Sequence, residues 1–391
     1  AGETNAYTIT IRGADATGST AAEFNAINSA TSEAINASVV TSISGTAADI
    51  ATLMSAAEQT AEFTATSFDL IAATDGLSIT GTTIDVTDLN NAITRANTTS
   101  NNTVLAAFAS AQGDITVNDG TITEFESLLQ LETESKINIT GLNLTTTTVN
   151  VTQANTLTGA TTGTVTATVN AGGVNALTAL NADGDNNAAL SITITDNSAS
   201  AADLNTINAA TTVAVDATAI ATISSSSLTD ISTLGAAITA GSIAATTAIG
   251  SINVSGDAID FTTLESEINR FDAFRIDPAV AAFTLADTTT VTLGTQDEVT
   301  AFLADVAANL VSVTGASQAV TVTPSGSGGV DISHTDAIAL AAAAGGTVTA
   351  TIVNTTTVAQ LATLYDAGET NAYTITIRGA DATGSTAAEF N

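Results

Sequence analysis

Hydrophobic and polar residues alternate over short stretches along the whole chain. In such a stretch every second side chain shares a face, so that Ile9 and Ile11, or Val213 and Val215, line one side of an extended segment. Alternation of this kind predicts half-buried β-strands. Strands are expected at residues 7–11, 78–79, 115–117, 137–139, 165–168, 192–194, 213–215, 252–254, 311–313, 348–352 and 373–377.

Segments with a helical spacing of apolar residues follow many of these strands, after turns rich in Gly, Asp, Asn or Ser. One such helix is expected to begin at Thr46. Three others begin with a Thr followed three residues later by a Glu, the spacing of a capping box, in which hydroxyl and carboxylate satisfy free amides of the first turn. These pairs are Thr121 with Glu124, Thr262 with Glu265, and Thr295 with Glu298.

Strand, turn and short helix recur roughly every 22–30 residues, a spacing typical of solenoids. A unit of about 26 residues cannot close a core alone, but stacking on copies above and below buries both strand faces. The expected fold is therefore a β-rich solenoid of stacked strand–turn–short-helix coils. The alternative is a string of small β-sandwich domains, which the two prolines and the absence of Trp make less favourable.

Two longer periods enclose the short one. Residues 1–25 recur unchanged as residues 367–391, which gives a period of 366 residues and is expected of a slice from a longer tandem array. Within that period three pairs of stretches resemble each other at offsets close to half of its length, and one of them aligns Arg95 with Arg270. The expected organisation is a first half-repeat of about seven coils at residues 1–183, a second of about seven coils at 184–366, and the start of the next period at 367–391.

The composition is strongly acidic, yet it contains enough apolar residues to build a core. Thirty-nine Asp and Glu face six Lys and Arg, a formal net charge of −33, while 44% of residues are hydrophobic. Nucleic acid is not an expected partner, because no basic stripe is present to neutralise phosphates. Membrane insertion is not expected either, because no stretch approaches the ~20 apolar residues of a spanning helix. The charge favours surroundings in which salt or divalent cations screen self-repulsion.

No residue pattern indicates an enzyme, and no catalytic residue is expected. The only histidine, His334, stands between Ser333 and Asp336 in a polar turn, but no nucleophile-elbow motif surrounds it. Acidic pairs such as Glu124 and Glu126, or Glu265 and Glu267, are expected to be helix-surface charges. A polysaccharide lyase on a β-helix is a further alternative, which the small number of scattered basic residues disfavours.

One loop offers the hard oxygen ligands that Ca²⁺ prefers. Residues 181–188, NADGDNNA, place Asp183 and Asp185 beside two asparagines around Gly184. The loop matches neither the twelve-residue helix–loop–helix pattern nor the glycine-rich nonapeptide of calcium β-rolls. A calcium loop at Asp183 and Asp185 is therefore a hypothesis, alongside diffuse screening of the surface by Ca²⁺ or Mg²⁺. No other cofactor is expected.

Strings such as NAYTITIRGADATGSTAAEFN and SITITDNSASAADLNTINAATTVAVDATAIATIS resemble repeats of very large bacterial cell-surface proteins. These Thr/Ala/Asn/Asp-rich β-strand-repeat chains are common in marine cyanobacteria and other aquatic bacteria, and some are giant adhesins. The resemblance covers most of the chain in pattern rather than through an invariant motif. It implies an extracellular or cell-surface location and transfers no ligand or catalytic residue to this sequence.

Two functions follow from the expected fold together with this resemblance. The first is a structural tandem repeat of an extracellular filament, fibre or giant surface protein, in which the solenoid sets length and stiffness. The alternative is the stalk of a giant bacterial adhesin whose binding domain lies elsewhere. The expected partners are copies of the chain itself, stacked end to end in tandem or as a polymer, and the cell envelope or matrix.

Overall fold

The structure is a computed structural model of the chain. It describes residues 5–12, 19–37, 39–40, 42–58, 76–99, 105–184, 187–245, 249–256, 258–272, 282–286, 289–313, 319–322, 331–344, 346–353, 357–364 and 371–375. The chain divides into two regions. The first comprises Ala1–Ala171, Ala179–Ile192 and Ala209–Val213, and the second Gly172–Thr178, Thr193–Asn208 and Ala214–Asn391. The half-repeat boundary expected at residues 183 and 184 falls where the two regions alternate along the chain, and it stays a prediction.

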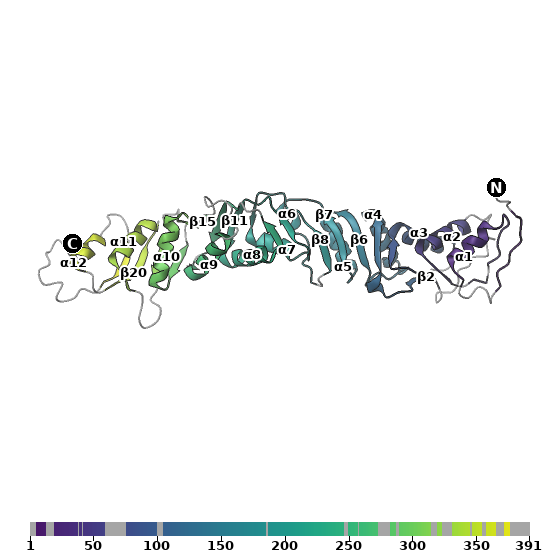
Figure 1. Cartoon of the computed structure of the whole chain (residues 1–391), viewed down its shortest axis with the longest axis horizontal. Helices are drawn as coiled ribbons and strands as arrows, with labels where there is room; N and C mark the ends of the chain where they lie inside the picture. The colour runs from purple at the N-terminus through teal and green to yellow at the C-terminus, as the bar shows by residue number, and fades with distance from the viewer. Residues whose placement is uncertain are drawn as a thin grey trace. The chain divides into compact units, whose positions relative to one another are not determined.

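Short helices and short strands alternate along both regions (Figure 1). The first region contains α1 (Ala21–Ser29), α2 (Ala47–Glu58), α3 (Val86–Thr99), the 3-10 helix η1 (Gln112–Asp114), α4 (Ile122–Thr133) and α5 (Val151–Ala160). The second region contains α6 (Val174–Leu177), α7 (Ala201–Asn208), α8 (Leu228–Ala240), α9 (Phe261–Asp272), α10 (Gln296–Ala307), α11 (His334–Ala343), α12 (Val358–Leu361) and the 3-10 helix η3 (Ala362–Leu364).

The strands of the first region form two parallel sheets. One has the order β1 (Ile43–Gly45), β2 (Leu77–Ile79), β4 (Ala106–Phe108). The other has the order β3 (Thr83–Asp85), β5 (Thr116–Gly120), β6 (Asn143–Val149), β7 (Val165–Val169), β8 (Ala188–Ser191). Strand order in each sheet therefore follows chain order.

The second region contains three parallel sheets built in the same way. The smallest pairs β10 (Val215–Ala217) with β12 (Ile243–Ala245). The second has the order β9 (Ser198–Ser200), β11 (Thr222–Ser227), β13 (Ser251–Ser255), β15 (Ala282–Leu285), β17 (Val311–Val313). The third has the order β14 (Ala258–Asp260), β16 (Thr290–Leu293), β18 (Ala319–Val322), β20 (Val348–Ile352), β19 (Asp331–Ile332), and β21 (Ala372–Thr374) also pairs with β20.

Each strand pairs in parallel with the corresponding strand of the next strand–helix repeat. The pair of Val149 with Val169 has one of the shortest separations along the chain, and the pair of Ile43 with Leu77 has one of the longest. The expected repeat of about 26 residues lies between the sequence separations of these two pairs. Antiparallel pairs, which a β-sandwich requires, do not occur between the strands of the described ranges. The observed architecture is mixed α/β with parallel sheets.

The core consists of alternate strand residues and one face of each helix. In β7, Val165, Ala167 and Val169 are buried while the threonines between them are exposed. On α4, Phe125 and Leu128 are fully buried at a spacing of three residues. Each fully buried side chain of this size contributes about 1.5–3 kcal/mol. Since a single repeat offers only a few such residues, a stable core needs the neighbouring repeats.

Most predicted strands are confirmed, and four differ. Residues 192–194 form only isolated bridges, at Thr193 and Ile194, and of residues 213–215 only Val215 belongs to a strand. Residues 376–377 of the last predicted strand lie outside the described residues.

Ile137 and Ile139 are buried but belong to a loop, because the amide of Leu142 closes a turn on the carbonyl of Ile139 (2.9 Å). In the segment 7–11 the structure shows one parallel bridge, between Thr10 and Asn36, instead of a full strand. The alternating pattern thus located many buried residues correctly, but Tyr7 and Val213 are exposed, and it overestimated the regular pairing.

The predicted helix caps are confirmed at two of three positions. Thr121 with Glu124 and Thr295 with Glu298 form capping boxes. The prediction of a cap at Thr262 is wrong, because α9 begins at Phe261. There the carboxylate of Asp260 accepts from the amide of Thr263 (3.1 Å) and performs the capping.

The order of helices repeats between the two halves of the period. Helices α1 to α6 contain 9, 12, 14, 12, 10 and 4 residues, and α7 to α12 contain 8, 13, 12, 12, 10 and 4. The two series match helix by helix, which supports an internal duplication. The described residues therefore hold six helices in each half, one fewer than the expected number of coils.

One glycine marks a close approach between a strand and a helix. Gly120 ends β5, and a Cβ atom built on it would lie 1.8 Å from Cγ1 of Val86, the first residue of α3. The carbonyl of Gly120 also accepts from the hydroxyl of Thr146 on β6 (3.2 Å). A side chain at this position would force β5 away from α3, from β6, or from both.

We expect Gly120→Ala to lower the free energy of unfolding by about 1–3 kcal/mol, the usual cost of overpacking. Urea denaturation followed by circular dichroism measures the change. The control is Gly159→Ala in α5, where a Cβ atom meets nothing within 4 Å and stability should stay the same or rise slightly. Equal stability of Gly120→Ala and the native chain would show that β5 and α3 are less closely packed than described.

Candidate functional site: polar contacts between successive helices

Four asparagines link one helix to the next repeat, and we call them the clamp asparagines. Each is the fifth residue of its helix, and each donates a side-chain hydrogen bond to a backbone carbonyl of the following repeat. The pairs are Asn25 to Asp49 (3.0 Å), Asn90 to Glu124 (2.7 Å), Asn155 to Ala179 (2.8 Å) and Asn205 to Asp230 (3.0 Å).

Three of the four acceptors also share one position, and the fourth, Ala179, follows α6. Asp49, Glu124 and Asp230 are each the third residue of the helix after the clamp asparagine. Asn25 and Asn205 occupy equivalent places in two stretches that resemble each other across half a period. The clamp therefore belongs to the repeat itself and recurs in both halves.

A second contact joins the first turns of neighbouring helices. The carboxylate of Glu124 accepts from the amide of its own cap, Thr121 (2.7 Å), and from the hydroxyl of Thr87 in the preceding helix α3 (2.6 Å). Glu298 repeats this in the second half, accepting from Thr295 N (3.2 Å) and from the hydroxyl of Thr262 in α9 (2.8 Å). The Thr87 hydroxyl, followed by the amide and hydroxyl of Thr121, lowers the pKa of Glu124.

The clamp asparagines differ in how completely they are hydrogen-bonded. Asn155 both donates to Ala179 O and accepts from Asn181 N (2.8 Å). The Oδ1 atoms of Asn90 and Asn205 are buried without a hydrogen-bond partner. An unsatisfied buried acceptor costs about 1–3 kcal/mol, so the contact at Asn155 should contribute the most to stability.

In the second region an ion pair strengthens the contact between α8 and α9. Glu267 is 2% exposed, and its Oε2 lies 3.1 Å from Nη1 of Arg270. The same Nη1 donates to the carbonyl of Ser232 in α8 (2.9 Å). The guanidinium thus lies beside a buried carboxylate of opposite charge, whose Oε2 accepts no hydrogen bond, and donates to a carbonyl of the neighbouring helix. Removing one partner of such a pair is costly, because the other remains charged and buried.

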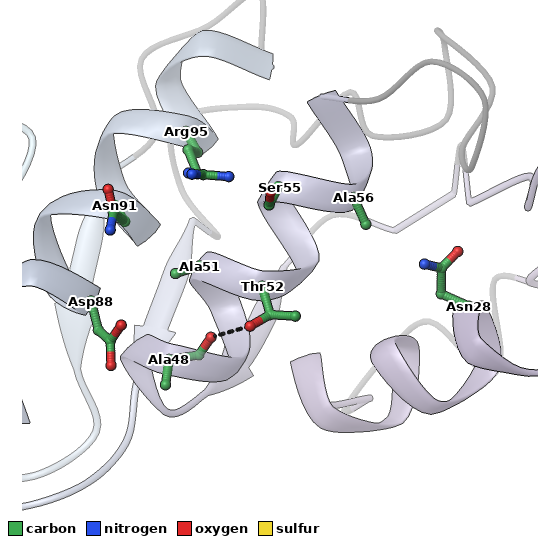
Figure 2. A pocket seen from close by; sticks show the side chains of 9 residues that line it. All are labelled: Asn28, Ala48, Ala51, Thr52, Ser55, Ala56, Asp88, Asn91 and Arg95. Carbon is green, nitrogen blue, oxygen red and sulfur yellow. Dashed lines mark hydrogen bonds between the residues drawn. The ribbon is translucent and has the colours of Figure 1, made fainter.

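The corresponding place in the first region is a surface cavity. Its volume is about 480 Å³, and Figure 2 shows its lining drawn from α1, α2 and α3. The lining combines small apolar side chains with hydroxyls, amides, one carboxylate and one guanidinium. It consists of Asn28, Ala48, Ala51, Thr52, Ser55, Ala56, Asp88, Asn91 and Arg95.

The two halves differ here at two aligned positions. Arg95 aligns with Arg270, but Met54 stands where α8 has Gly235, and Ala92 stands where α9 has Glu267. A Cβ atom on Gly235 would lie 2.8 Å from Cδ of Arg270. A side chain at Gly235 would therefore displace Arg270 from the position it takes. The lining of the cavity in the first region contains no nucleophile paired with a base.

Two acidic side chains meet between α9 and α10. Asp305 is partly buried, and its Oδ2 has no hydrogen-bond partner. Burial, followed by repulsion from Glu265, raises the pKa of Asp305 to about 6. Glu265 is also the fifth residue of α9, the position that a clamp asparagine, Asn90, holds in α3. The second half thus has a carboxylate at the position where the first half has a clamp asparagine.

The residues singled out for chemistry have structural roles where they are described. Ser333 and Asp336 bond to each other (2.8 Å) as the cap of α11, and His334 is the first residue of that helix. The carboxylate of Asp183 accepts from the amides of Asn187 (2.9 Å) and Ala188 (3.1 Å). Asp185 lies outside the described residues, so the calcium loop stays a prediction.

Searches of the described ranges for a metal site and for a membrane span were both negative. Those ranges contain no group of three or more His, Cys, Asp or Glu side chains that could hold a metal ion. No helix in them is long and apolar enough to cross a membrane. Comparison of the chain with protein-family models, with curated proteins and with solved structures finds no match.

We expect Asn155→Ala to lower the free energy of unfolding by about 2 kcal/mol, because two hydrogen bonds are lost at about 1 kcal/mol each. Asn205→Ala should cost less than about 1 kcal/mol, since it loses one bond and also removes an unsatisfied buried oxygen. Urea titration measures both. Asn97→Ala, at an asparagine that donates within its own helix to Ile93 O, is the control for helix propensity. A larger loss at Asn205 than at Asn155 would contradict this ranking.

The raised pKa of Asp305 predicts a loss of stability as pH rises. Folding favours the protonated carboxyl, so the native chain should lose stability between pH 4 and pH 6, near the raised value. Asp305→Asn should remove this loss and be about 1 kcal/mol more stable at pH 7.5, after allowance for solvent screening of a partly exposed group. At pH 4 the two proteins should be equally stable.

Glu265→Gln should shift the pH range of this stability loss only part of the way toward lower pH, because it removes the repulsion on Asp305 but leaves that side chain buried. Asp297→Asn, at an exposed position of the same helix, is the matched control and should give no gain at pH 7.5. Thermal melting across pH 4 to 8 provides the comparison. An identical pH profile for Asp305→Asn and the native chain would refute the assignment.

Proposed function

We propose that the chain is a structural tandem repeat of an extracellular filament, fibre or giant surface protein, and that its repeats stack as a β-rich solenoid. The observation that carries the proposal is the regular, parallel pairing of each strand with its counterpart in the next repeat. Each repeat then interacts mainly with its neighbours, and length grows in proportion to the number of repeats.

The helix contacts support the same function. Clamp asparagines and shared capping carboxylates connect consecutive repeats, so they resist sliding and opening along the direction of stacking. Of the polar groups considered for chemistry, Glu124 takes part in these contacts, and Ser333 with Asp336 caps its own helix. A net charge of −33 favours surroundings in which salt or divalent cations screen the repulsion between like charges. We therefore propose a location outside the cell or at its surface.

The solenoid predicts the dimensions of the chain in solution. Fourteen coils spaced by ~4.8 Å extend about 65–70 Å per 366-residue period. Small-angle X-ray scattering of the chain should therefore show a rod of constant cross-section, at 0.5 M NaCl to suppress repulsion between molecules. Scattering typical of a sphere, or of globules joined by flexible linkers, would rule out the solenoid.

The adhesin stalk is the second candidate, favoured by the resemblance to giant surface proteins. Electron microscopy of native material separates the two: a uniform fibre supports the filament, and a thin tether ending in a distinct head supports the stalk. The mass of the denatured native protein then identifies how repeats are joined. About 39 kDa, near the 38.6 kDa of this chain, indicates polymerised subunits, and hundreds of kDa indicate covalent tandem copies.

A further inference from the structure

The same 25-residue sequence occurs at residues 1–25 and 367–391, and the structure describes part of both copies. In the first copy it describes residues 5–12 and 19–25, and in the second residues 371–375. Asn5, Ala6, Tyr7, Thr8 and Ile9 therefore have identical counterparts, in order, in Asn371 to Ile375. Identical sequences in different surroundings show which contacts this segment is able to make.

The first copy is hydrogen-bonded to the repeat that follows it. The carbonyl of Asn5 accepts from Ser32 N (3.0 Å), and the carbonyl of Ile9 accepts from Asn36 N (2.9 Å). The amide of Ile11 donates to Asn36 O (2.8 Å). Every backbone group involved belongs to an odd-numbered residue of the segment.

The second copy is paired with the repeat that precedes it. β21 lies in parallel register with β20, with Ala350 opposite Tyr373. The side chain of Asn371 accepts from Val348 N (2.8 Å), and the phenol of Tyr373 donates to Ala337 O in α11 (3.3 Å). The described contacts of this copy thus reach backward along the chain.

The two sets of contacts use opposite edges of one strand. Successive residues of a strand direct their N–H and C=O groups to alternate edges. Since odd residues bond forward in the first copy, Ala6 and Thr8 point to the other edge, where no hydrogen bond holds their backbone in the described ranges. Val353 N donates to Ile332 O of β19, so the odd residues of β20 face β19 and Ala350 faces β21. With Ala350 opposite Tyr373, its bonds fall on Ala372 and Thr374, the counterparts of Ala6 and Thr8.

We infer that the outer edge of residues 5–11 is a docking edge for a strand with the sequence of β20, supplied by a preceding copy of this chain. Successive 366-residue periods then share one unbroken parallel sheet, in which residues 371–377 of one period are residues 5–11 of the next. This inference rests on the proposed function and specifies how one period joins another.

The side chains support this particular occupant. Tyr7 is 56% exposed, whereas its counterpart Tyr373 is half-buried with its phenol on Ala337 O. Ile375 is 41% exposed, whereas its counterpart Ile9 is half-buried. Each copy thus buries a side chain that the other leaves exposed, and joining two periods would bury both.

Specificity follows from two of these contacts. Any strand can add backbone hydrogen bonds at an open edge. A strand with the sequence of β20 and its preceding helix α11 also supplies an amide for the side chain of Asn5 and a carbonyl for the phenol of Tyr7. A second copy of this chain therefore fits the edge better than an unrelated strand.

The test extends the full chain at its end with a second copy of residues 26–171, joined directly after Asn391. Amide hydrogen exchange is then read in the peptide spanning residues 358–377, which occurs once in this protein. In the first copy Tyr7 N donates to the hydroxyl of Thr31 (3.0 Å), and Ile11 N donates to Asn36 O. We therefore expect exchange at their counterparts Tyr373 and Ile377 to slow by at least 100-fold relative to the unextended chain. Unchanged exchange at both residues would overturn the inference.

A matched pair of variants controls the experiment. Asn36→Pro in the appended copy removes the amide that would donate to the carbonyl of Ile375, the counterpart of Ile9. The strand pairing is then disrupted, so the protection at Tyr373 and Ile377 should fall. The same Asn36→Pro substitution in the first copy should leave that protection in place. Equal effects of the two variants would also overturn the inference. If the chain is a rod in solution but Tyr373 and Ile377 stay unprotected, the proposed function still holds. Successive periods would then be separate rods joined by linkers instead of one continuous sheet.

Discussion

The structure depends on the need of each strand for a neighbour on both edges. Short strands, such as β1 and β2, leave N–H and C=O groups unsatisfied on two sides, and buried backbone groups must be paired. The parallel arrangement meets this need by placing the same segment of the next repeat alongside. Helix positions, clamp asparagines and shared capping carboxylates all follow, since each requires that neighbouring repeats stay in register.

The sequence predicted the elements well and their connections poorly. Alternation identified buried residues such as Val165 in β7, and capping boxes placed the starts of α4 and α10 correctly. The clamp asparagines were missed, because an asparagine in the middle of a helix carries no local signal. Their only signal is the recurrence of Asn at the fifth position of α1, α3, α5 and α7, which becomes visible once the helix starts are known. Asp305 could not be found either, since its environment is made in part by a side chain of another helix.

Comparison of the two halves shows how duplicated repeats diverge without losing their stacking. Met54 with Ala92 and Gly235 with Glu267 occupy the same contact in the two halves, and in the second half Glu267 pairs with Arg270. A side chain at Gly235 would displace the side chain of Arg270. Replacement of a clamp asparagine by Glu265 was tolerated although it placed a second carboxylate beside Asp305. The parallel pairing of strands is thus the same in both halves, while the side-chain contacts between neighbouring helices differ.

The identical 25-residue segments have a consequence for the gene that encodes such an array. If periods join through one shared sheet, every junction has the same sequence and the same neighbours. Recombination between two copies of the segment then adds or removes whole periods and leaves each remaining contact unchanged. Natural variants of different length would therefore fold equally well, and selection could adjust the reach of the protein without testing a new interface.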